Sequence, residues 1–163
     1  WNLLEWAPID QPEHGAITHQ NMFLVKTLNT AAKLAEFTDD REGATDCLAK
    51  AAKLRTAINT HLWSEERQAY IDCIHADGRR SESISMQIQV VAYLCDIAEG
   101  ERKQRLESYL ASPPAEFLQI NSAFMAFFYY EALSRLGLTE RMLDDMRQGF
   151  GMMLRHGATT CYD

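Results

Sequence analysis

The stretch Asn121-Ser-Ala-Phe-Met-Ala-Phe-Phe-Tyr-Tyr-Glu-Ala-Leu-Ser-Arg-Leu136 carries apolar residues on most sides of the helix that its pattern predicts. Residues 18–37 and 82–97 have the same character, although the first half of 82–97 could also form a strand. A helix that is apolar over most of its circumference must be covered on all sides. The three segments are therefore predicted to be the inner helices of the fold.

The segments between these helices are apolar on one face only. They cover about 41–63, 100–110 and 139–155. A helix with one apolar face lies at a surface, so the simplest arrangement has an inner and an outer layer, built as three consecutive helical hairpins. Three hairpins are half of a six-hairpin toroid, and the predicted fold class is all-α, a single fragment of an (α/α)6 toroid over 1–163. The inner helices start roughly 65 and then 40 residues apart, which fits a TPR or HEAT array poorly because such arrays repeat at a constant period.

Local signals predict where several of these elements begin and end. Residues 68–74 alternate enough for one short strand or hairpin, and Asp77-Gly78 is a turn signal. The run 39–42 offers an aspartate N-cap with Glu42 placed for a capping box. Gly137 suits a helix C-terminal cap, and Thr139 suits the N-cap of the next helix.

Composition excludes several classes of function. The formal net charge of -7 argues against a nucleic-acid partner, which would require a basic face. No apolar run approaches the roughly 20 residues needed to span a bilayer, so no membrane partner is expected.

The cysteines and the acidic residues give no sign of a metal site. Three of the four cysteines (Cys47, Cys73, Cys95, Cys161) lie in apolar contexts and none has CxxC spacing, which favours buried free thiols over disulfides or zinc. This leans towards a reducing, cytoplasmic compartment. An acidic cluster over 39–46 lacks EF-hand spacing and is better explained by helix capping. We expect no metal and no cofactor.

Three motifs near the end of the chain resemble those of bacterial α-L-rhamnosidases, the six-hairpin glycosidases of glycoside hydrolase family 78. They are the stretch 122–137, Phe150-Gly-Met-Met153, and Gly157-Ala-Thr-Thr160. In that family a helix ending in a Trp-Gly-x-Met-like turn precedes a Gly-Ala-Thr-Thr-x-Trp-Glu element. The run Leu3-Leu-Glu-Trp6 is also similar to the family's Asp-Trp element. Tyr162 stands where the family has Trp, and Asp163 stands where it has its catalytic Glu.

The resemblance implies hydrolysis of terminal α-L-rhamnosides by an inverting acid/base mechanism. Asp163 would be the catalytic base, and Thr160 beside it could donate a hydrogen bond that keeps the carboxylate ionised. The family's general acid lies in an Arg- and Glu-rich segment upstream of anything in this chain. The chain begins without Met and ends on its most motif-like segment, so we expect the C-terminal half of a catalytic domain, inactive or nearly so by itself.

Five residues are candidate substrate contacts: Glu5, Trp6, Asp10, His19 and Thr160. Trp6 could stack on the apolar face of a sugar or fill the core below the first hairpin. Glu5 and Asp10 could accept hydrogen bonds from sugar hydroxyls or cap backbone groups. His19 lies at the start of the first inner helix, where toroids gather binding groups.

Two other interpretations stay open from sequence. A toroid fragment could act on other glycosides, since fold does not fix the substrate, or the chain could be a helical binding module without chemistry. An open groove around Glu5, Trp6 and Asp163 would favour the enzyme. Inner helices without neighbours should expose apolar surface and drive self-association.

Overall fold

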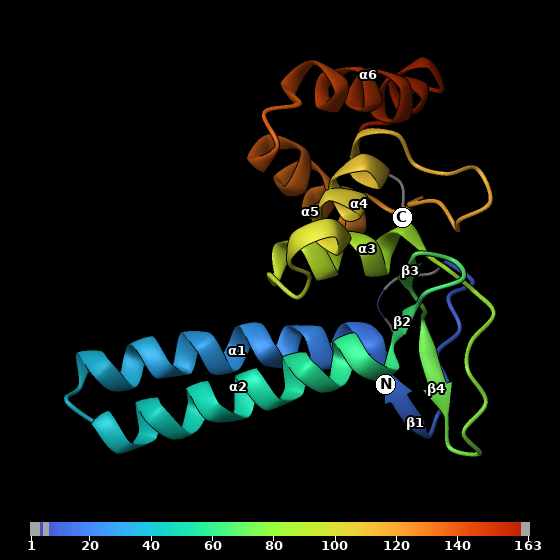
Figure 1. Cartoon of the computed structure of the whole chain (residues 1–163). Coiled ribbons are helices and arrows are strands. Elements are labelled where there is room, and N and C mark those ends of the chain that lie inside the picture. Colours follow the sequence, from blue (N-terminus) through green and yellow to red (C-terminus); the bar gives the residue numbers. More distant parts are fainter. Residues whose placement is uncertain (1–3, 5–6, 161–163) are drawn as a thin grey trace.

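The computed structural model describes Leu4 and residues 7–160 of the chain. The expected all-α fold with six helices in three consecutive hairpins is confirmed, together with a few short antiparallel strands (Figure 1). The elements follow in the order β1 (Gly15–Ile17), α1 (Thr18–Phe37), α2 (Arg41–His61), β2 (Trp63–Ser64), β3 (Ala69–Tyr70), β4 (Cys73–His75), α3 (Met86–Leu94), α4 (Gly100–Ala111), α5 (Ala123–Arg135) and α6 (Thr139–Arg155).

The three hairpins lie side by side through their first helices. Helix α3 contacts both α1 and α5, and each of these three helices also packs against the helix that follows it. Phe23 of α1 meets Phe128 of α5 edge-on, with ring centroids 6.1 Å apart. Helices α1, α3 and α5 therefore form the inner row, with α3 in the middle.

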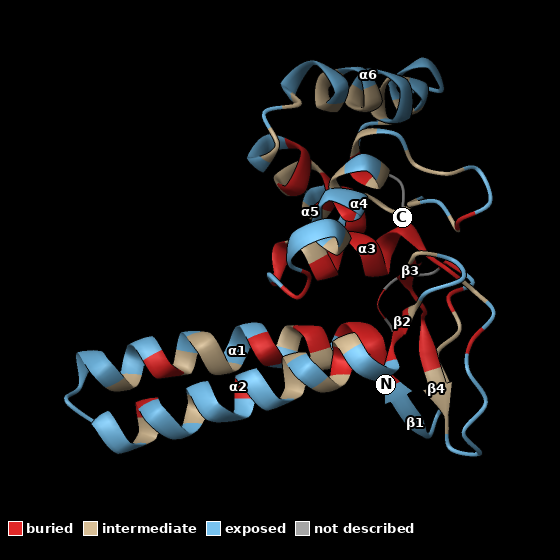
Figure 2. Cartoon of the chain, viewed as in Figure 1, coloured by how far each residue is buried: buried red, intermediate tan, exposed pale blue. Residues whose placement is uncertain are grey.

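Only the middle helix is covered as the sequence predicts. All of α3 is buried except Tyr93 (Figure 2). In contrast, Phe37 of α1 is 89% exposed and Phe127 of α5 is 66% exposed. The difference has a simple cause: α3 has an inner helix on each side, whereas α1 and α5 each have one.

Short strands surround the start of α1. Strand β1 pairs antiparallel with β4, with Gly15 opposite His75 and Ile17 opposite Cys73, and β2 pairs with β3. The predicted strand at 68–74 is thus divided between β3 and β4, and its partners were not predicted. Gly15 is required where it stands, because its φ is +146° and an added Cβ would lie 2.2 Å from the Ile74 carbonyl oxygen.

Several predicted boundaries were wrong for identifiable reasons. Helix α3 is shorter than 82–97 because Ser85 forms an isolated parallel bridge to Leu118, and Asp96 adopts a left-handed φ of +51°. Asp40 is the N-cap of α2 and accepts a hydrogen bond from the Gly43 amide at 2.9 Å, so the third helical position holds glycine and no capping box forms with Glu42.

The hairpin of α5 and α6 tests the last two boundary predictions. Gly137 follows α5 with φ +71°, as expected for a C-terminal cap. Thr139 is the first residue of α6 and not its N-cap, which is Leu138. Among the described residues, no helix is long and apolar enough to cross a membrane.

Candidate active site

The segments that precede the three inner helices meet at one end of the fold. The Thr18 amide, at the start of α1, donates to the Asp72 carbonyl at 3.1 Å, and its hydroxyl donates to the Ile71 carbonyl at 2.7 Å. The Met86 amide, at the start of α3, donates to the Leu118 carbonyl in the segment that leads to α5. Residues far apart in sequence are therefore held together at the N-terminal ends of α1, α3 and α5.

Asp72 lies at the centre of this junction and is completely buried. Its Oδ1 accepts hydrogen bonds from the Ser85 amide at 3.1 Å and the Ser85 hydroxyl at 2.7 Å, and its Oδ2 accepts one from the Asp10 amide at 3.3 Å. Burial raises the pKa of Asp72 to about 6, although the Ser85 hydrogen bonds oppose the rise. One carboxyl thus joins the segment before α1 to Ser85, the N-cap residue of α3.

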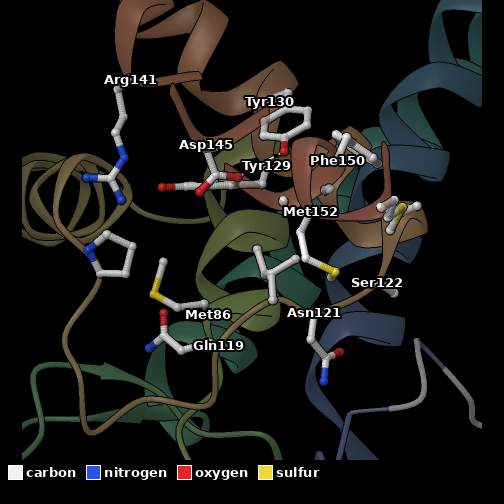
Figure 3. Close-up of a pocket in the computed structure, with 16 residues that line it drawn as sticks. Met86, Gln119, Asn121, Ser122, Tyr129, Tyr130, Arg141, Asp145, Phe150 and Met152 are labelled. Atoms are coloured by element: carbon white, nitrogen blue, oxygen red, sulfur yellow. Dashed lines mark hydrogen bonds between the residues drawn. The ribbon is translucent and has the colours of Figure 1, made fainter. Parts of the chain in front are cut away.

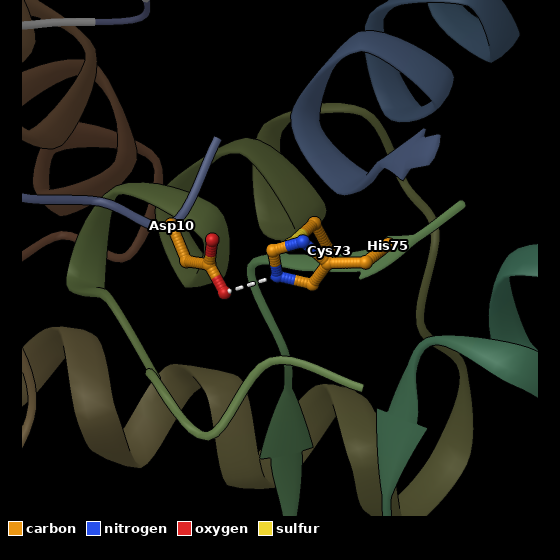
Figure 4. A group of neighbouring side chains, drawn as sticks. All are labelled: Asp10, Cys73 and His75. Carbon is orange, nitrogen blue, oxygen red and sulfur yellow. Dashed lines mark hydrogen bonds and ion pairs between the residues drawn. The ribbon is translucent and has the colours of Figure 1, made fainter. Parts of the chain in front are cut away.

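Asp10, a predicted substrate contact, lies beside Cys73 and His75 of β4 (Figure 4). Its Oδ2 is 2.9 Å from His75 Nε2. Burial opposes ionisation of Asp10, but hydrogen bonds from His75 and Ser81 outweigh it and lower the pKa of the carboxyl. Burial raises the pKa of the Cys73 thiol to about 12, and the negative charge of Asp10 adds to the rise.

His19, the second described candidate, is 3% exposed in the first turn of α1. Burial lowers the pKa of its imidazole to about 4, so the ring is neutral at pH 7. Its Nδ1 has no hydrogen-bond partner among the described residues. Asp10 and His19 share one region of the molecule, because Asp72 binds the Asp10 amide through its side chain and the Thr18 amide through its carbonyl.

Of the remaining predicted site residues, the structure describes only Thr160. Thr160 is exposed and follows α6. Glu5, Trp6 and Asp163 lie outside the described residues, so the groove predicted around them remains a prediction. Gln89, a buried polar residue of α3, belongs to the core: its side chain bonds the Tyr70 amide and the carbonyls of Tyr70 and Ser85. Cys73 and Cys95 are buried free thiols as expected, and Cys47 is a half-buried one.

A cavity of about 240 Å³ lies between α5, α6 and the segment that leads to α5 (Figure 3). Residues that line it include Gln119, Asn121, Tyr129, Tyr130, Asp145 and Phe150. The Tyr130 hydroxyl donates to Asp145 Oδ2 at 2.9 Å, so α5 and α6 are also joined by a polar contact at its wall. This cavity was not predicted from the sequence, because the segments that line it carry no motif when each is considered alone.

Comparison with known proteins identifies the family. Residues 1–163 match the bacterial alpha-L-rhamnosidase six-hairpin glycosidase domain. The crystal structure of the glycoside hydrolase family 78 rhamnosidase of Bacillus sp. GL1 is 58% identical, with a TM-score of 0.96 over 100% of this chain and 17% of that chain.

A more distant structure, a rhamnosidase from Klebsiella oxytoca with rhamnose bound, is 20% identical. It has a TM-score of 0.77 over 100% of this chain and 29% of that chain, and shows likeness of fold. The chain thus spans less than a third of either protein. A search of curated proteins gave no match. On the full-length family match and the 58% identity, the chain belongs to the six-hairpin glycosidase domain of bacterial α-L-rhamnosidases in glycoside hydrolase family 78.

Proposed function

We propose that this chain forms part of the catalytic domain of a glycoside hydrolase that cleaves terminal α-L-rhamnosides with inversion. The observation that carries the proposal is the match of all 163 residues to the family's six-hairpin domain, supported by 58% identity to a family 78 rhamnosidase. The junction before α1, α3 and α5 supports it further, because it gathers Asp10, His19 and Asp72 at the end of the inner row where the predicted contacts begin.

Inversion requires an acid that protonates the leaving oxygen and a base that activates water on the opposite face of the sugar. The two carboxyls must be about 6.5–9.5 Å apart to leave room for that water. In this proposal Asp163 is the base, Thr160 stabilises its ionised form, and Trp6 stacks on the sugar. Glu5 and the exposed edge of Asp10 would accept hydrogen bonds from sugar hydroxyls.

The general acid would come from a segment that precedes this chain in the natural protein. The chain spans 17% of one rhamnosidase and 29% of another, which supports its being a fragment of the domain. An inverting enzyme needs both carboxyls, so we propose that the isolated chain does not turn over substrate.

The test uses an aryl α-L-rhamnoside with both the isolated chain and the natural protein that contains it. The natural protein should release β-L-rhamnose as the first product, seen by proton NMR, and Asp163→Asn should reduce kcat by at least about 100-fold because a general base contributes 10²–10⁴-fold. Asp77→Asn, in an exposed turn, is the matched control and should leave kcat unchanged.

Three outcomes would count against the proposal. Robust turnover by the isolated chain would place both carboxyls within its 163 residues. First release of α-L-rhamnose would indicate retention and a nucleophile in place of the base. Turnover of another glycoside without turnover of the rhamnoside would leave the fold assignment unchanged but would contradict the proposed substrate.

A further inference from the structure

Three side chains with different metal-binding atoms meet at the edge of the β1–β4 sheet. The carboxylate of Asp10, the thiol of Cys73 and the imidazole of His75 lie with their ligand atoms all within 4.8 Å of one another (Figure 4). The closest pair is Asp10 Oδ2 and His75 Nε2, at 2.9 Å. The Cys73 thiol also hydrogen-bonds the Asp10 carboxylate, so the nitrogen, the oxygen and the sulfur form one cluster.

The backbone holds two of these groups on one face of a strand. Cys73 and His75 are two residues apart in β4, and side chains at i and i+2 in a strand point to the same side. Strand β4 is fixed on both edges: it pairs with β1, the Ser81 amide donates to the Cys73 carbonyl at 2.9 Å, and the His75 amide donates to the Arg79 carbonyl at 2.8 Å.

The third group arrives from a different segment and is fixed separately. The Asp10 amide donates to the buried Asp72 carboxyl, which belongs to the residue before Cys73. A backbone contact thus holds Asp10 opposite β4 in addition to the contact of its own side chain with His75. The ligand set is preorganised, and this lowers the cost of gathering it around an ion.

The chemistry of the set favours a borderline transition metal. Zinc is bound by cysteine sulfur, histidine nitrogen and carboxylate oxygen, whereas Ca²⁺ and Mg²⁺ prefer oxygen ligands alone. Cys73 is fully buried, while the side chains of His75 and Asp10 are 17% and 28% exposed, so the cluster is partly open to solvent through these two residues.

We propose that Asp10, Cys73 and His75 form a zinc-binding site that fastens the segment before β1 to β4. The three protein ligands leave a fourth tetrahedral position for water. On binding, the Cys73 thiol gives up its proton to solvent and bonds the metal as thiolate, while the neutral His75 ring bonds it through a nitrogen lone pair. The sequence alone pointed away from zinc because the ligands show no CxxC spacing; they come from two segments that only the fold brings together. This inference does not depend on the proposed hydrolase function.

The test measures zinc binding to the purified chain by isothermal titration calorimetry. We expect one zinc per chain and a higher melting temperature with zinc than with excess chelator. Loss of a ligand should exceed the 10–100-fold effect of losing an outer hydrogen-bond partner, so Cys73→Ser and Asp10→Asn should each weaken zinc binding by more than about 100-fold. Cys47→Ser, at a half-buried cysteine of α2, is the matched control and should bind zinc as the wild type does.

Binding of Co²⁺ gives a second readout, which uses the wild-type chain and does not require the ligand variants to fold. Co²⁺ bound by the wild-type chain should show a thiolate-to-metal charge-transfer band, and the band should persist in Cys47→Ser. A wild-type chain that binds neither metal, or binds Co²⁺ without this band, would overturn the proposal. It would also be overturned if folded Cys73→Ser bound zinc as tightly as Cys47→Ser, because Cys73 would then be an ordinary core thiol.

Discussion

Ionisation of Asp72 should lower the free energy of unfolding of the wild-type chain as the pH rises. Asp72→Asn should abolish this decrease. Asp72 is fully buried, and burial raises its pKa from 3.8 to about 6. A carboxyl whose pKa is higher in the folded state than in the unfolded state stabilises the fold while it is protonated. That contribution declines as the pH rises through the interval between the two values.

The expected size follows from the two pKa values. The full effect is about 3 kcal/mol, since one pKa unit corresponds to about 1.4 kcal/mol. Between pH 4.5 and 7.5 the part that is lost is about 2 kcal/mol, because the unfolded-state carboxyl is already largely ionised at the lower pH. His19 acts in the opposite direction: its lowered pKa of about 4 makes the fold less stable by roughly 2–3 kcal/mol as the pH falls over the same interval.

These two contributions oppose each other in the wild-type profile, so the variant is needed to isolate that of Asp72. Urea unfolding of both chains at pH 4.5 and 7.5 gives four free energies of unfolding. In Asp72→Asn the side-chain NH2 group either faces the Asp10 amide, so that two donors meet, or replaces the oxygen that accepts hydrogen bonds from Ser85. Either change lowers the free energy of unfolding by about 1–3 kcal/mol at every pH. It therefore cancels when the pH dependences of the two chains are compared. The variant should gain about 2 kcal/mol relative to wild type on going from pH 4.5 to 7.5. Equal pH dependence in the two chains would refute the reasoning.

Three further changes test the packing around the inner row. Gly15→Ala should lower the free energy of unfolding by at least about 2 kcal/mol in urea titration, because its Cβ would meet the Ile74 carbonyl. Tyr129→Phe should lower it by about 1–2 kcal/mol, since the Tyr129 hydroxyl donates to the buried Leu110 carbonyl at 2.9 Å. We also propose that the isolated chain self-associates through its exposed apolar residues; Phe127→Gln should then shift it towards monomer in light scattering at micromolar concentration.

Each of these changes has a matched control in the same chain. Gly78→Ala has open space and only a positive φ to strain it, so it should cost about 1–2 kcal/mol. Tyr93→Phe removes the hydroxyl of a half-buried tyrosine and should change stability by less than about 0.5 kcal/mol. Lys53→Gln, at an exposed position, should leave association unchanged. A wild-type chain that is already monomeric would contradict the association proposal directly.

The periodicity of apolar residues was sufficient to predict helices whose bounds are set by nearby residues. Helix α1 spans the predicted residues 18–37, and Gly137 ends α5 as its conformational freedom suggests. The errors occurred where partners distant in sequence decide the structure. Residues 82–85 were predicted to be helical but precede α3, because Ser85 is extended and bridges to Leu118. Strand β1 escaped notice because three residues carry too little pattern to reveal a partner in β4.

The residues of the candidate site differ in the same way: those marked by their position along the chain were predicted, and one that is held by distant partners was not. Sequence drew attention to Asp10 and His19 through their position before and within the first inner helix, and both do lie near the junction of the inner row. It passed over Asp72, which sits in a strand-like run and has no motif to mark it. Yet Asp72 is the residue that fixes Asp10 opposite β4 and ties it to Ser85. A charged residue inside an alternating run, followed by Cys73-x-His75, is the signal that could have predicted this arrangement, because a buried carboxyl must find donors and its position constrains whatever supplies them.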